Sequence, residues 1–166
     1  MSTAHDEKMK RAAWASYSAW DRVALAEAFI RRLEDSASHD QTVSTRWSLY
    51  IVASALYSAV NICQVQLELK EHATTAWFKN DLALINSLRH AGVHGSQGVQ
   101  GSKGFHGLYQ EPEATEGSVS VTLWFVRDGQ SAEEFTLDVV LATLRRAIER
   151  VSAYVETATG MRYTTT

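Results

Sequence analysis

An arginine and a histidine five residues apart are the side chains of this sequence best suited to chemistry. Arg89, His90 and His94 stand where an amphipathic pattern ends and a run of glycines begins. A guanidinium is permanently charged and holds phosphate oxygens with a planar set of N–H donors, whereas an imidazole exchanges protons near neutral pH. The group therefore predicts chemistry on a phosphate ester, at a helix end beside a loop.

The charge distribution fits an enzyme that touches a few phosphates. The chain has 166 residues, enough for one domain with a sizeable core, and a net charge of -3. That charge argues against a protein that coats a duplex. Between residues 79 and 107, however, Lys79, Arg89 and Lys103 face only one acid, Asp81. A local positive patch on an acidic body is therefore expected.

Cysteine usage and hydropathy indicate a cytoplasmic protein. A single cysteine, Cys63, rules out an internal disulfide and a multi-cysteine metal site, and the histidines lack the spacing of metal ligands. We expect neither metal nor cofactor. The start does not resemble a signal peptide, and the most apolar run, 49–60, is shorter than the roughly 18 residues of a membrane span. No contact with a membrane is expected.

Apolar periodicity predicts four helices in a single domain over residues 1–166, after a disordered start at 1–6. The first helix covers about 7–34, with an apolar face of Trp14, Tyr17, Val23 or Ala24, Leu25, Phe29 and Leu33. The second begins at Thr42 or Ser44, runs to about residue 72 and is apolar nearly all round, which places it centrally or in a subunit interface. The third runs from about residue 75 to Gly92.

Six glycines at three-residue spacing, from Gly92 to Gly107, predict a flexible glycine-rich loop over 92–117. Residues 118–126 then alternate between apolar and polar, Asp128-Gly129 is a turn signal, and 134–136 fit a short return strand. A β-hairpin within 118–136 is therefore expected before the last helix. The fold class is mainly α: a four-helix bundle with a small β-hairpin.

The last helix has the clearest pattern. Its expected range is 137–157, with Thr136 as the N-cap and Gly160 as the stop. Its apolar stripe consists of Leu137, Val140, Leu141, Leu144, Ile148, Val151 and Tyr154. Arg145, Arg146 and Arg150 form a basic face, which we expect to be solvated.

The string Leu88-Arg89-His90-Ala91-Gly92-Val93-His94 resembles the R-x(4–6)-H signature of the HEPN superfamily, with Arg89, the polar His90 and His94 in the motif positions. These proteins are small helical bundles, many of them metal-independent ribonucleases of toxin–antitoxin and antiviral-defence systems. The order of elements is also similar, since two long helices precede the motif and one follows it. The resemblance implies a HEPN-like bundle and a metal-independent endoribonuclease.

The resemblance also implies roles for individual residues. Two subunits of a homodimer would bring Arg89 and His94 to one cleft. Arg89 would hold the scissile phosphate, and His94 would remove the 2′-hydroxyl proton or donate one to the leaving 5′-oxygen. His90 would support the site, while Lys103 and His106 would contact RNA. An antitoxin or other regulatory protein is the implied partner, and DNA would be inert because it lacks the 2′-hydroxyl.

Two other interpretations remain open at this stage. Arg89 and His94 could be a cation pair placed favourably against the dipole at a helix C-terminus. The chain as a whole could be a non-catalytic helical interaction protein, whose tryptophan-rich helices bind a partner protein or ligand. Cleavage of RNA in the presence of a chelator distinguishes the enzyme from the interaction protein.

Overall fold

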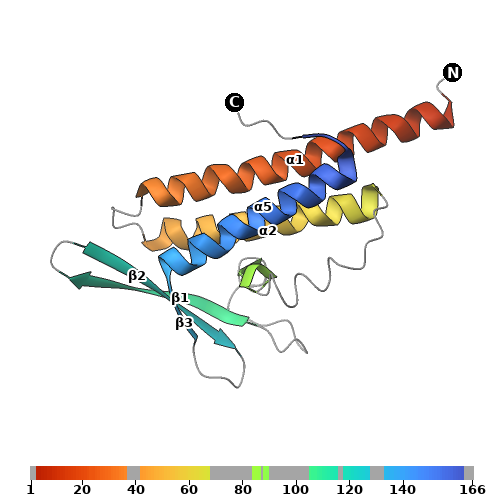
Figure 1. The fold of residues 1–166 in the computed structure, drawn as a ribbon. Coiled ribbons are helices and arrows are strands. Elements are labelled where there is room, and N and C mark those ends of the chain that lie inside the picture. Colours follow the sequence, from red (N-terminus) through yellow and green to blue (C-terminus); the bar gives the residue numbers. More distant parts are fainter. Residues whose placement is uncertain are drawn as a thin grey trace.

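The protein is mainly helical (Figure 1). The computed structural model describes residues 3–36, 42–67, 84–86, 88–89, 105–115, 118–127 and 133–162, with side chains for 3–35, 47–67, 84–86, 88–89 and 136–162. Three long helices, α1 (Ala4–Ser36), α2 (Thr42–Gln66) and α5 (Leu137–Thr159), lie side by side, with α1 antiparallel to the other two. A β-sheet lies at the end of the bundle where α5 begins.

Helix α1 begins earlier than the sequence pattern indicated. The Thr3 side-chain Oγ1 accepts a hydrogen bond from the Asp6 backbone N–H (3.3 Å), and Asp6 Oδ2 accepts one from the Thr3 N–H (3.2 Å). This reciprocal pair is a capping box, which satisfies two backbone donors at the helix start. The prediction of disorder for 1–6 is therefore wrong from Thr3 onward, and residues 1–2 lie outside the described part of the chain.

The buried face of α1 is only partly the predicted one, and Phe29 packs against the core as expected. Val23 and Leu33 are buried as expected, but Trp14 and Tyr17 are 73% and 56% exposed and Leu25 is 37% exposed. The stripe that enters the core is Ala15, Ala19, Val23, Ala26, Ile30 and Leu33, at three- and four-residue steps, and Trp20 is buried beside it. Small side chains in this stripe allow neighbouring helices to approach α1 closely, and the most extensive contact of α1 is with α2.

Helix α2 packs against both other long helices. Most of the apolar run at 49–60 is buried against α1, α5 and the helical segment near residue 85. Packing within one chain therefore accounts for much of this apolar run, and the homodimer remains a prediction. The stretch Trp47–Gln66 is long and apolar enough to cross a membrane, and half of it is buried in the bundle. A core helix of a helical bundle meets the same two criteria.

Helix α5 confirms its predicted pattern. All seven residues of the predicted apolar stripe are buried, and Ala147 and Val155 join them. Thr136 is the N-cap, with extended backbone angles and no side-chain cap bond. Gly160 ends the helix in the left-handed region (φ 67°), where its N–H donates to the Glu156 carbonyl at 2.8 Å.

The sheet differs from the expectation of a loop over 92–117. Strand β1 (Phe105–Thr115) pairs antiparallel with β2 (Ser118–Arg127), which pairs antiparallel with β3 (Glu133–Thr136), giving the order β1-β2-β3. The loop prediction is therefore wrong for 105–115, and its residues 92–104 fall outside the described ranges. Pro112 lies in β1, an edge strand, where a missing N–H is tolerated.

Candidate functional site

The third helix of the sequence pattern is described only at 84–86 and 88–89, and both pieces are helical. Ile85 and Leu88 are fully buried in the core, and Leu84 packs against it. Three apolar side chains within five residues therefore fix this segment to the bundle. Such anchoring holds the backbone of the next residue, Arg89, in one place relative to α2.

The Arg89 guanidinium lies over the face of an aromatic ring. The guanidinium carbon is 3.8 Å from the centroid of the Tyr57 ring, which α2 contributes. The Arg89 side chain is half-buried, and its Nε atom is shielded from solvent. A guanidinium attracted to the face of a phenol ring keeps its N–H bonds in its own plane, directed outward along its edges. The stack thus orients a permanently charged group that suits phosphate oxygens.

The structure describes one complete side chain of the predicted site. His90, His94 and Lys103 lie outside the described residues, so their distances from Arg89 are untested predictions. His106 has a described backbone. It lies in β1 rather than in a loop, at a register shift where Phe105 pairs with Arg127 and Gly107 with Val126. Such bulges redirect a side chain and are frequent near active sites.

Cys63 is not a candidate nucleophile. It is a free thiol in the core, and burial raises its pKa to about 11. The thiolate is the reactive form, so the thiol is inert at neutral pH. Among the residues that the structure describes, no group of three or more His, Cys, Asp or Glu side chains is placed to hold a metal ion.

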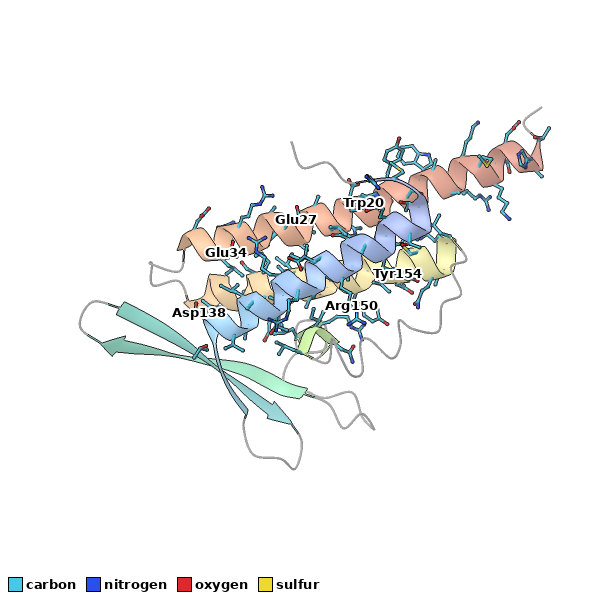
Figure 2. The ribbon with its side chains drawn as sticks, in the orientation of Figure 1. Trp20, Glu27, Glu34, Asp138, Arg150 and Tyr154 are labelled. Atoms are coloured by element: carbon cyan, nitrogen blue, oxygen red, sulfur yellow. The ribbon has the colours of Figure 1, made fainter. Side chains whose placement is uncertain are left out.

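An ion pair joins α1 to α5. Arg145 donates two hydrogen bonds to the Glu34 carboxylate, one from Nε (2.9 Å) and one from Nη2. The guanidinium lowers the pKa of Glu34 below its ordinary value, chiefly through this hydrogen bond. Arg145 is partly exposed, as the predicted solvated face requires, but its guanidinium is paired, whereas Arg146 is exposed and bonds to Thr143 Oγ1 (3.1 Å). Figure 2 shows Glu34 on α1 toward the end of the bundle where α5 begins.

A groove between α1 and α2 was missed by the sequence analysis. It is an open groove of about 370 Å³ and is predominantly apolar. Arg22 and Leu25 come from α1, and the other lining residues come from α2: Trp47, Tyr50, Ile51, Ser54, Ala55 and Ser58. The Trp47 and Tyr50 rings meet edge to face, with centroids 5.8 Å apart at 88°. The available signal was Ser54 and Ser58, two small polar residues one turn apart within the apolar run 49–60.

Comparison with known proteins found no match for this chain. No protein-family model matches the chain, and neither the curated proteins nor the solved structures contain a match. The chemistry of the site therefore has to be argued from Arg89, Tyr57 and the residues around them.

Proposed function

We propose that this protein is a metal-independent endoribonuclease of HEPN type, acting as a cytoplasmic homodimer in a toxin or antiviral-defence system. The observation that carries the proposal is the Arg89 guanidinium held 3.8 Å from the Tyr57 ring centroid. Two long helices before this residue and one after it agree with the element order of that superfamily. The four-helix HEPN-like bundle with its β-hairpin, and regulation by an antitoxin, belong to the same proposal.

Arg89 supplies the binding and electrostatic part of the reaction. The Arg89 Nε is buried, and its terminal Nη groups would hold the two non-bridging oxygens of one phosphodiester. The negative charge on those oxygens grows as the phosphorus becomes five-coordinate, and a preoriented cation stabilises it. His106 and Lys103 would add contacts to the RNA, and His90 would support His94.

His94 supplies the proton transfers. In a composite cleft, one subunit's imidazole takes the ribose 2′-hydroxyl proton while the 2′-oxygen attacks the phosphorus. The bond from phosphorus to the 5′-oxygen breaks, and the imidazole of the other subunit protonates that oxygen. The products are a 2′,3′-cyclic phosphate and a 5′-hydroxyl. DNA lacks the attacking group and remains intact.

The test is cleavage of labelled RNA in EDTA. We expect the wild-type protein to cleave, His94→Ala to lose about 10²- to 10⁴-fold in rate, and Arg89→Ala about 10²- to 10³-fold. Arg146→Ala removes an exposed arginine of α5 and is the matched control, with activity unchanged. Cleavage that requires a divalent metal, or equal rates in all variants, contradicts the proposal.

Variants of Tyr57 test whether catalysis needs Arg89 to be oriented by the aromatic ring or needs only a positive charge at this position. Tyr57→Phe retains an aromatic face and should keep the rate, whereas Tyr57→Leu removes it and should lower kcat. Arg89→Lys keeps the charge but loses the planar fork, so it should behave like Tyr57→Leu rather than like wild type. Equal kcat for the Phe and Leu variants would show that the ring does not orient Arg89.

A second candidate function is a non-catalytic interaction protein. The observation in its favour is the group of exposed apolar side chains near the start of α1, where Met9, Trp14 and Tyr17 are each more than half exposed. Aromatic side chains of this kind are common anchors in protein interfaces. Absence of cleavage on every RNA tested, with loss of partner binding in Trp14→Ala, would favour this function.

A further inference from the structure

The groove between α1 and α2 has the size and the wall composition of a small-molecule binding site. Its volume of about 370 Å³ falls within the range of pockets that hold small organic molecules. Its walls are apolar and aromatic, and three polar side chains, those of Arg22, Ser54 and Ser58, line it alongside the Tyr50 phenol. A mostly apolar cavity with a few polar groups is the usual composition of such pockets.

Arg22 gives the groove a preference for anions. Other arginines of the bundle are engaged, since Arg31 contacts Glu27 and Arg145 binds Glu34. Within the part of the chain that the structure describes, Arg22 makes neither a hydrogen bond nor an ion pair. A guanidinium at the edge of an apolar groove attracts a carboxylate, sulfonate or phosphate that it can bind with two N–H donors.

The serines on α2 point to additional polar recognition. Hydroxyls in these helices commonly bond to the carbonyl four residues earlier, as Ser16 does to Ala12 and Thr143 to Val139. Neither Ser54 nor Ser58 makes such a bond to any described residue. Their hydroxyls can therefore each donate or accept a hydrogen bond inside the groove.

The aromatic wall selects the shape of the ligand. Trp47 is 53% exposed, and its ring is held edge to face against Tyr50. A fixed indole face beside Leu25 and Ile51 suits a flat ring, which can stack at an offset on the indole. The expected ligand therefore has an aromatic body and one anionic substituent.

We propose that the groove lined by Arg22, Leu25, Trp47, Ser54 and Ser58 binds a small aromatic anion, with the anionic group on Arg22 and the ring against Trp47. This site is formed by α1 and α2 alone and does not include Arg89 or Tyr57. Its success or failure is therefore independent of the proposed ribonuclease activity.

Two dyes with the same rings test the proposal on the full chain. Anilinonaphthalene sulfonate carries an anionic group, and phenylnaphthylamine lacks it. Fluorescence titration should show both dyes binding, the sulfonate more tightly. Arg22→Gln should weaken the sulfonate by about fivefold and leave the neutral dye unchanged, because only the charged contact is lost. Arg11→Gln, an exposed arginine of α1 outside the groove, is the matched control with no change for either dye.

A variant that fills the groove provides a second test of the proposal. Ser58→Leu should abolish binding of both dyes while circular dichroism and the unfolding midpoint stay near wild type, because Ser58 is only partly buried. Sulfonate affinity that is unchanged in Arg22→Gln, or dye binding that is unchanged in Ser58→Leu, overturns the proposal. A dimer that Ser58→Leu converts to a monomer by light scattering also overturns it, since a second copy would then occupy the groove.

Discussion

Helices α1 and α5 both pack against α2 and against each other, yet they bury different kinds of side chain (Figure 1). Helix α5 buries a stripe dominated by leucine, valine and isoleucine, whereas α1 buries several alanines and exposes Trp14 and Tyr17. Hydrophobicity alone predicted the buried face of α5 correctly and that of α1 only in part. The size of a buried side chain follows from how closely two helices approach, and that distance is a property of the pair.

The largest expected effect on stability comes from truncating a buried side chain of α5, compared with an exposed side chain of α1. Leu144→Ala removes a fully buried side chain of α5 and should cost about 2–5 kcal/mol of unfolding free energy through lost burial and a residual cavity. Trp14→Ala removes a larger but exposed side chain of α1 and should change stability by no more than about 0.5 kcal/mol. Urea unfolding measures both. A comparable loss for Trp14→Ala would show that this face of α1 is covered in solution.

A smaller effect tests the alanine seam of α1. Ala26 is fully buried there, so Ala26→Leu inserts a larger side chain into a filled space and should cost about 1–3 kcal/mol. Ala28→Leu makes the same change two residues away at an exposed position, where stability should stay within about 0.5 kcal/mol of wild type. If thermal unfolding shows equal midpoints for the two variants, the seam is loosely packed and the explanation for the misassigned face fails.

The smallest effect concerns the bond that joins the two helices, Arg145 to Glu34. Because the pKa of Glu34 is lowered in the folded state, the pair stabilises at pH above the ordinary glutamate value, and this stabilisation is lost as pH falls through the lower folded value. Both side chains are more than a third exposed, so Glu34→Gln should cost less than about 1 kcal/mol at pH 7.

The stability of Glu34→Gln relative to wild type, measured from pH 3 to pH 7, provides the control for this ion pair. At pH 3 the difference between Glu34→Gln and wild type should shrink or vanish, because the carboxylate is then largely protonated in the unfolded chain and increasingly so in the folded one. Asp21→Asn changes another exposed acid of α1 and should show no such convergence. A Glu34→Gln deficit that is constant from pH 3 to pH 7 would mean that the ion pair does not stabilise the fold.

The candidate site was predictable only as a set of residue types. Arg89 was identified by its spacing from His94, yet nothing in that spacing indicated that its guanidinium would lie on the Tyr57 ring, 32 positions earlier in the chain. The groove behind the aromatic-anion proposal was missed for the same reason, because Arg22 and Trp47 share it only after α1 and α2 have packed. Contacts between elements leave little trace in local periodicity.

The sequence by itself determined the features that depend on neighbouring residues. These are the existence of three long helices, the apolar stripe of α5 and its end at Gly160, because periodicity, capping and left-handed glycine act within a few residues. Tertiary structure alone decided which face of α1 is buried, that 105–115 join a sheet, and which side chains meet Arg22, Arg89 and Arg145. The physical reason is that burial and pairing depend on the distance and orientation between whole elements, which many non-local contacts set together.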